Sequence, residues 1–183
     1  MKIETNRLLL NNYTFDDFEY YCLLKSSDKV WQYSTFTPYQ DDREAFSDFK
    51  KILDSLNDNP YQFAALWTKE ENRFIGEAGI LSLNKQANRC VLGYNILPDY
   101  WNMGFATEIT KALVSHAFEN LHVERIEALA MSLNLASRKV LEKSGFLLEG
   151  TLRHYAKIKD NYFNVCYYSI IASEYQNILS SPS

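Results

Sequence analysis

The sequence predicts an α/β fold in which a single domain is built on a mixed, mostly antiparallel sheet flanked by helices. Its 183 residues, 46% of them hydrophobic, are enough for one substantial core. The hydrophobic residues recur at strand-like spacing in some segments and at helical spacing in others, which indicates both kinds of element. No internal repeat or low-complexity segment divides the chain. We therefore expect one domain over residues 1–175 and a C-terminal tail over residues 176–183.

The N-terminal third reads as one strand and two helices. The predicted elements are a strand over residues 7–10, a helix over 15–24 capped by Thr14 or Asp16, an aromatic loop over 31–39, and a helix over 42–56. In the second helix, Phe46, Phe49 and Ile52 recur at helical spacing. The run Asn57-Asp58-Asn59-Pro60 then ends that helix.

The hydrophobic period changes after Pro60, and three strand-like segments follow, over residues 61–67, 74–83 and 91–97. Short polar turns join them, so they predict an antiparallel meander. A helix over residues 106–121 and a strand over residues 125–131 come next. Because a strand, a helix and a strand follow one another here, we expect a parallel crossover.

The last predicted helix, residues 134–144, has clear signals at both ends. Asn134 can cap its start, and Gly145 suits the left-handed conformation just past its end. Phe146 falls where a Schellman motif places a hydrophobic contact with Leu141. Residues 147–153 and 162–171 close the fold as a hairpin pair.

The composition disfavours several classes of protein. A net charge of −4 is unfavourable for a large nucleic-acid interface. Cys22, Cys90 and Cys166 are scattered without C-x-x-C spacing, so we expect neither a disulfide framework nor a metal site. No apolar run approaches the roughly 20 residues that span a bilayer, and residues 1–7 contain no apolar signal core. We expect no membrane partner and a cytoplasmic location.

The most informative motif is Trp-Asn-Met-Gly-Phe-Ala-Thr-Glu at residues 101–108, between a predicted strand and a predicted helix. A glycine-bearing turn that opens a helix presents unpaired N–H groups, so the motif predicts a phosphate-bearing ligand. Gly104 is not part of a G-x-G-x-x-G dinucleotide loop or of a P-loop with its Gly-Lys pair. The phosphate loop therefore belongs to a different class, and a simple turn glycine is the alternative.

Four motifs in order resemble the GNAT superfamily of N-acetyltransferases. They resemble especially its RimJ/RimL-like branch, which acetylates ribosomal-protein N-termini. Residues 98–108 are similar to the branch's P-x-Y-W-G-x-G-Y-A-T-E, and residues 5–10 to its opening T-x-R-L-x-L. Residues 125–128 resemble its fifth strand, and residues 134–146 its second cofactor motif. The resemblance covers nearly the whole chain and implies a sheet whose central strand pair splays apart.

The resemblance implies that acetyl-CoA is bound as the acetyl donor. Backbone N–H groups of the loop would hold its pyrophosphate, with Gly104 letting the backbone approach closely. Backbone groups of the third meander strand would hold the pantetheine arm and polarise the thioester carbonyl. One of Arg138, Lys139 and Lys143 would reach the 3′-phosphate unless all three are solvated. The implied cofactor-binding residues are Ile96, Leu97, Asn102, Met103, Gly104, Phe105, Ala106, Thr107, Asn134 and Ser137.

Ser137 and Glu77 are the predicted catalytic residues. The tyrosine that many members of the superfamily use as general acid falls at Leu141, so Ser137 is expected to protonate the leaving thiolate; a purely local role for this serine is the alternative. Glu77 is the first candidate for the general base, with a solvated strand residue as the alternative. An aspartate common in the last hairpin of the branch is Asn164 here, which argues against a base at that position. Other candidates for the base are Asp99, His154, Tyr155 or a chain of waters.

These residues predict an enzyme that transfers an acetyl group from acetyl-CoA to a primary amine by direct attack in a ternary complex. The expected acceptor is a protein or peptide N-terminus, such as that of a ribosomal protein. A small amine, namely a polyamine, an amino sugar or an antibiotic, is the alternative. The aromatic loop either packs in the core or shapes the acceptor cleft. A non-catalytic CoA-binding module and a dinucleotide-binding protein are rival hypotheses. We expect a monomer or a homodimer.

Overall fold

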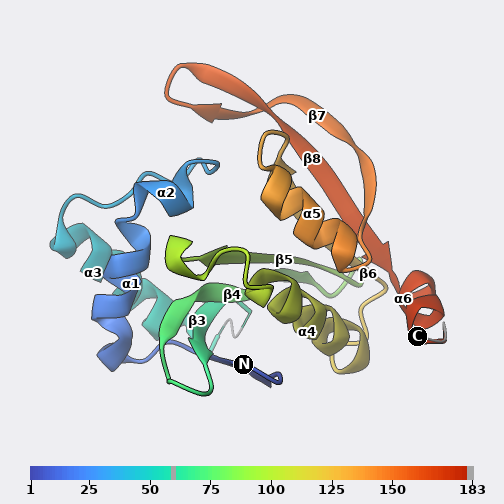
Figure 1. The fold of residues 1–183 in the computed structure, drawn as a ribbon, viewed down its shortest axis with the longest axis horizontal. Helices are drawn as coiled ribbons and strands as arrows, with labels where there is room; N and C mark the ends of the chain where they lie inside the picture. Colours follow the sequence, from blue (N-terminus) through green and yellow to red (C-terminus); the bar gives the residue numbers. More distant parts are fainter. Residues whose placement is uncertain (59–60, 181–183) are drawn as a thin grey trace.

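The computed structural model describes residues 1–58 and 61–180, and this part of the chain is built on one eight-stranded sheet (Figure 1). The strands are β1 (Lys2–Glu4), β2 (Leu8–Asn11), β3 (Phe63–Thr68), β4 (Phe74–Asn84), β5 (Arg89–Ile96), β6 (Arg125–Met131), β7 (Leu147–Ile158) and β8 (Asn161–Ile171). Their order across the sheet is β1-β2-β3-β4-β5-β6-β8-β7. Neighbouring strands are antiparallel except β5 and β6, which run parallel. The predicted α/β fold is confirmed.

Helices cover both faces of this sheet. They are α1 (Phe18–Lys25), α2 (Asp28–Trp31), α3 (Asp42–Ser55), α4 (Phe105–Glu119), α5 (Leu135–Lys143) and α6 (Ala172–Ser180). Alternate residues of a strand point to opposite faces. Accordingly, Ala64 and Leu66 of β3 pack in the core cluster that contains the buried side of α4, whereas Ala65 packs in the aromatic cluster under α1 and α3.

The parallel pair β5–β6 is the point at which the sheet opens. Its pairing covers Arg89–Val91 opposite Arg125–Glu127, while β5 continues to Ile96. Beyond this short ladder β6 keeps its antiparallel partner β8 along its full length. The predicted splay of the central strand pair is therefore present, and α4 connects the two diverging strands.

The two ends of α5 form as the sequence predicts. The Asn134 side-chain oxygen accepts a hydrogen bond from the Ser137 N–H at 3.0 Å. At the other end, the Phe146 N–H donates to the Leu141 carbonyl and the Gly145 N–H to the Glu142 carbonyl, both at 3.1 Å. These two bonds define a Schellman motif, so the helix is held between fixed ends.

Four elements differ from the sequence prediction. Strand β1 and helix α2 were not expected, and α6 runs across the predicted boundary at residue 175, with Tyr175 stacked on Phe118 at 4.9 Å. Strand β7 continues past the predicted end at residue 153, because the break in its alternation is a bulge and not the end of the strand. At the bulge the Asn164 side chain accepts a hydrogen bond from the His154 N–H at 2.9 Å. The predicted helix stop at Asn59-Pro60 and the end of the predicted tail, residues 181–183, lie outside the described residues.

Cys22, Cys90 and Cys166 are free thiols. Within residues 1–58 and 61–180, no group of three or more His, Cys, Asp or Glu side chains is arranged to bind a metal ion. None of the helices in this part of the chain has both the length and the apolar character needed to cross a bilayer.

Candidate active site

A cavity of about 480 Å³ lies at the C-terminal end of β5. Its walls come from β5, the start of α4, one side of α5, and α2 with the residues that follow it. Figure 1 shows α2 and α5 on the same side of β5, with the β7–β8 hairpin arching over α5. The cavity thus joins the predicted cofactor loop to the predicted aromatic loop.

The structure brings most of the predicted cofactor residues to this cavity. Those that line it are Ile96, Asn102, Gly104, Phe105, Ala106, Thr107, Asn134 and Ser137. Leu97 and Met103 do not line it. The Leu97 side chain is buried in the aromatic cluster, and the Met103 side chain of the loop is half exposed.

The loop has the backbone conformation that a phosphate cradle needs. Gly104 has φ +81° and Asn102 has φ +62°, values that direct successive peptide groups inward. The Gly104 carbonyl accepts the first helical hydrogen bond, from the Glu108 N–H at 3.0 Å. The N–H groups of the residues between them have no carbonyl one turn earlier to pair with, so they are available to an anion.

The loop is tied to the turn between β1 and β2 through Glu108. The Thr5 hydroxyl donates to the Glu108 carboxylate at 2.6 Å, and the Arg7 guanidinium does so at 2.7 Å. Arg7 also donates to the Met103 carbonyl at 3.0 Å and lies over the Phe105 ring. Two motifs that are distant in sequence, residues 5–10 and 98–108, therefore meet at one carboxylate.

Strand β5 directs backbone groups toward the open side of the sheet. The Leu97 N–H donates to the Ile75 carbonyl of β4 at 2.9 Å. Because antiparallel strands alternate their hydrogen-bonding direction, the N–H and carbonyl groups of Tyr94 and Ile96 point away from β4, toward the side where β6 has diverged. The Trp101 indole donates to the Ile96 carbonyl at 2.7 Å. The Ile96 N–H is thus the donor that this residue presents at the opening.

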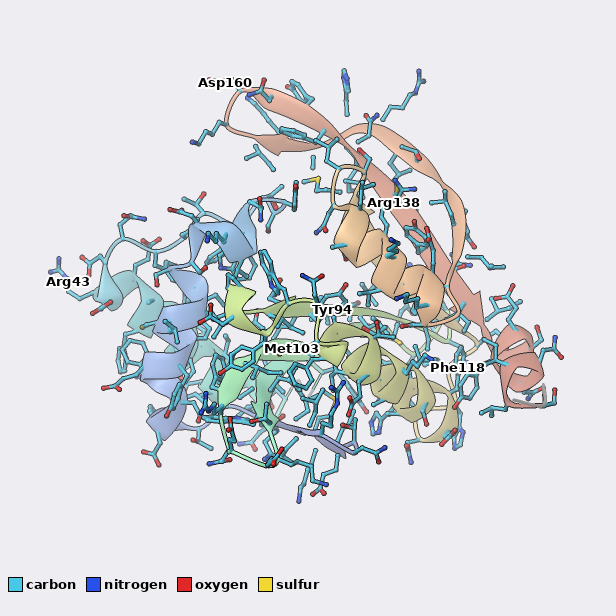
Figure 2. The ribbon with its side chains drawn as sticks, viewed as in Figure 1. Arg43, Tyr94, Met103, Phe118, Arg138 and Asp160 are labelled. Atoms are coloured by element: carbon cyan, nitrogen blue, oxygen red, sulfur yellow. The ribbon has the colours of Figure 1, made fainter. Side chains whose placement is uncertain are left out.

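Sequence reasoning missed Tyr94, which pairs with the predicted acid. Its hydroxyl lies 3.0 Å from the Ser137 hydroxyl, and both residues line the cavity. Figure 2 shows Tyr94 on β5 between α4 and α5, with Met103 just before α4. Burial raises the pKa of Tyr94 to about 12, so the phenol stays protonated at neutral pH. Tyr94 is two residues before Ile96 and shares its face of the strand, a spacing that could have identified it.

The basic residues of α5 have different surroundings. Lys139 and Lys143 line the cavity one helical turn apart. Arg138 instead donates to the Tyr168 hydroxyl at 3.1 Å and to the Ser132 carbonyl at 3.3 Å, and is not part of the cavity wall. An anionic ligand in the cavity would meet the two lysines and not the arginine.

Glu77 is fully buried, so the alternative of a solvated strand residue is wrong. Its carboxylate accepts hydrogen bonds from the Lys25 ammonium at 2.7 Å, the Asn95 amide at 2.8 Å and the Tyr13 hydroxyl at 3.2 Å. Glu77 itself does not line the cavity, whereas Asn95 does. The Asn95 side chain therefore lies between the Glu77 carboxylate and the cavity, and is hydrogen-bonded to that carboxylate.

The aromatic loop divides between the two predicted roles. Tyr33 lines the cavity. Trp31 and Phe36 pack on each other with ring centroids 4.4 Å apart, and the Tyr39 hydroxyl donates to Asp48 at 2.6 Å.

Of the other candidates for the base, Asp99, His154 and Tyr155 are exposed and none lines the cavity. Asn164 supports the β7 bulge through its side chain.

The cavity fits an N-acetyltransferase, and comparison with known proteins supports the same class of enzyme. Residues 7–147, well over half of the chain, match the acetyltransferase (GNAT) domain family. The chain therefore belongs to the GNAT family of acetyltransferases, as the resemblance predicted.

Similar proteins match this chain over nearly its whole length. An "Uncharacterized N-acetyltransferase p20" from Bacillus licheniformis is 31% identical over 172 residues, which are 93% of this chain and 96% of that protein. Spermidine N-acetyltransferase from Vibrio cholerae, solved with CoA and spermine, has a TM-score of 0.83 at 21% identity, covering 94% of this chain and 100% of the other. A "putative ribosomal-protein-serine acetyltransferase" from Vibrio cholerae has a TM-score of 0.77 at 20% identity, covering 93% and 97%. At these identities the two structures share the fold.

Proposed function

We propose that this acetyltransferase moves the acetyl group of acetyl-CoA to the α-amine of a protein or peptide N-terminus, as in the RimJ/RimL-like branch. The observation that carries the proposal is the charge of the cavity. Its wall includes Lys29, Lys139 and Lys143, and no aspartate or glutamate among the described residues. A phosphate-rich donor suits such a wall, and a polycationic acceptor does not.

The donor would lie along the side of the cavity formed by α4 and α5. Loop N–H groups from Asn102 to Thr107 would hold the pyrophosphate, and Lys139 and Lys143 would face its negative charge. Asn134 would bond the pantetheine arm through its amide N–H groups, since its side-chain oxygen already caps α5. The Ile96 N–H would polarise the thioester carbonyl.

The chemical step would be direct attack. The neutral amine forms a bond to the carbonyl carbon, the C–S bond breaks, and the amine's surplus proton leaves to solvent or to a base. The Ser137 hydroxyl would protonate the departing thiolate. A peptide α-amine has a pKa near 7.7–8.0, against about 10.4 for lysine, so it needs little help to become neutral. Glu77 as the general base remains a prediction.

A polyamine acceptor is the second candidate, because the chain shares its fold with a spermidine N-acetyltransferase. A panel that contains N-terminal peptides, spermidine, an amino sugar and a free lysine side chain separates the two. We expect thiol release and a mass increase of one acetyl group with the peptides, at a kcat/KM at least tenfold above that with spermidine. The opposite ranking would overturn the peptide proposal and leave the acetyltransferase intact.

A further inference from the structure

The cavity wall at Asn95, which we call the acceptor side, is held in place by a buried hydrogen-bond network around Glu77. Glu77 of β4 and Asn95 of β5 are direct cross-strand partners, so their side chains share one face of the sheet. On that face the carboxylate also meets Lys25 of α1 and Tyr13, and the Lys25 and Glu77 side chains are 7% and 0% exposed. The sheet and α1 together therefore fix the position of this carboxylate.

Lys25 fills a cage of aromatic rings. Its ammonium lies 4.5 Å from the centre of the Trp31 ring. The other rings around it are those of Tyr21 at 5.3 Å, Phe36 at 5.2 Å and Phe63 at 5.4 Å. A cation held by a carboxylate and several ring faces is strongly stabilised where it is. The Glu77 charge is thus balanced inside the protein and is not presented to a substrate.

This network determines which way the Asn95 amide faces. The Glu77 carboxylate only accepts hydrogen bonds, so the Asn95 group 2.8 Å from it must be the NH₂. The amide is planar, and its carbonyl oxygen therefore points away from Glu77. Asn95 is part of the cavity wall and directly precedes Ile96. The acceptor side consequently offers a neutral hydrogen-bond acceptor next to the predicted thioester site.

We propose that Asn95 positions the acceptor: its side-chain oxygen accepts a hydrogen bond from an N–H of the attacking primary amine, and Glu77 and Lys25 act only by holding that amide. This inference rests on the proposed acetyl transfer. With one N–H bound to Asn95, the nitrogen lone pair is directed at the carbonyl carbon beside Ile96. An amide oxygen does not take up the proton, which leaves to water. Glu77 is then a positioning residue instead of the general base.

The test compares two changes in the purified full chain. Asn95→Ala should raise the KM for the peptide acceptor and lower kcat/KM by about 10- to 100-fold, because the amine loses its alignment. The affinity for acetyl-CoA should stay unchanged. An unaltered kcat/KM in Asn95→Ala would overturn the proposal. Asn84→Ala, at the end of β4 next to the β4–β5 turn, is the matched control and should keep wild-type kinetics.

The second change separates positioning from base catalysis. Removing Glu77 alone would leave the Lys25 ammonium buried without its partner, so the variant Lys25→Met with Glu77→Gln neutralises both charges together. The glutamine oxygen can still accept from the Asn95 NH₂. We expect kcat/KM to fall by only about 2- to 5-fold, with the pH dependence of kcat/KM unchanged. The limb set by the pKa of the substrate amine stays in every variant. Loss of a second acidic limb below it, with a fall as large as in Asn95→Ala, would identify Glu77 as the base.

Thermal melting of both variants, with and without acetyl-CoA, shows whether each one folds and binds the donor. If the double variant does not fold, the assignment rests on Asn95→Ala and on Asn95→Asp, whose added charge beside Glu77 should also raise the acceptor KM. A wild-type protein that binds acetyl-CoA but acetylates no amine would contradict the proposed function. An active wild type with unaffected Asn95 variants would contradict only the present inference.

Discussion

At the scale of single residues, two hydroxyl groups from different elements meet at the proposed site of bond breaking. Ser137 comes from the first turn of α5 and Tyr94 from β5, with 3.0 Å between their oxygens. A hydroxyl donates one hydrogen bond and accepts two. If Tyr94 donates to Ser137, the serine O–H is free to turn toward a leaving thiolate. Tyr94 then orients the acid without losing its own proton.

We therefore expect Tyr94→Phe, which removes only the hydroxyl, to lower kcat about 5- to 20-fold with little effect on acetyl-CoA affinity. Ser137→Ala should lower kcat further. The double variant should match Ser137→Ala alone, since the two groups act as one unit. Additive losses would mean that the two hydroxyls work separately. The control is Tyr175→Phe, which removes the hydroxyl that joins Tyr175 of α6 to Glu119 of α4.

Gly104 carries the second prediction at this scale. Its φ of +81° is rare for residues with a side chain, and a Cβ there would lie 3.4 Å from the Arg7 guanidinium. Gly104→Asp adds strain and a negative charge at the predicted pyrophosphate. We expect the Kd for acetyl-CoA to rise at least tenfold, measured by calorimetry. Unchanged affinity would mean that the phosphates bind elsewhere.

At the scale of elements, the turn between β1 and β2 packs on the start of α4 and holds the predicted cofactor loop in place. Glu108 accepts hydrogen bonds from Thr5, from the Arg7 backbone and from the Arg7 side chain, and its own side chain is 20% exposed. Burial alone would raise the pKa of Glu108, but these hydrogen bonds outweigh it and lower the pKa below its ordinary value of 4.5. The ionised carboxylate is therefore the form that the fold favours.

A lowered pKa in the folded state stabilises the protein above the ordinary glutamate pKa, and this contribution is lost as the pH falls through the folded value. Glu108→Gln should lower the free energy of unfolding at pH 7 by about 1–2 kcal/mol, a range kept small because Arg7 is half exposed. The difference in unfolding free energy between wild type and variant should shrink below about pH 4.5. Urea unfolding at pH 7 and at pH 3.5 measures it. A difference independent of pH would contradict this account. Glu124→Gln, at an exposed glutamate, is the control.

At the scale of the whole molecule, the cavity lies between two parts of one sheet. Strands β1–β5 and strands β6–β8 share a ladder of only three residue pairs, Arg89–Val91 with Arg125–Glu127, and are also joined by α4. The cavity wall takes residues from both sides of this junction, including β5 and α5. A ligand bound there would contact both parts and stabilise their arrangement.

Acetyl-CoA at 100 times its Kd should accordingly add about 2.7 kcal/mol to the stability, which raises the Tm of a chain of this size by about 5–10 °C. NAD at the same concentration should not. Stabilisation without acetylation of any amine would favour a CoA-binding module, and stabilisation by NAD instead would favour a dinucleotide-binding protein. If CoA gives no shift at all, the donor assignment fails.

Local signals in the sequence were sufficient for much of the fold and for the glycine turn that lines one side of the cavity. The α5 caps, the glycine turn at Gly104 and the meander depend on contacts within a few residues, which the chain carries in its own order. Strand β7 was predicted too short because its bulge breaks the alternation on which strand prediction relies. Helix α2 has only four residues, too few for a periodic pattern.

By itself, the sequence determined the family, the α/β fold and the position of the glycine turn that opens α4, because each of these is encoded in spacing along the chain. Only the tertiary structure decided what surrounds Glu77 and Ser137. Lys25 lies 52 residues from Glu77 in sequence, and Tyr94 lies 43 residues from Ser137. No local pattern links such residues, since they meet only when α1 and α5 pack against the sheet. The ion pair of the buried Glu77 carboxylate and the pairing of the Tyr94 and Ser137 hydroxyls are therefore properties of the packing.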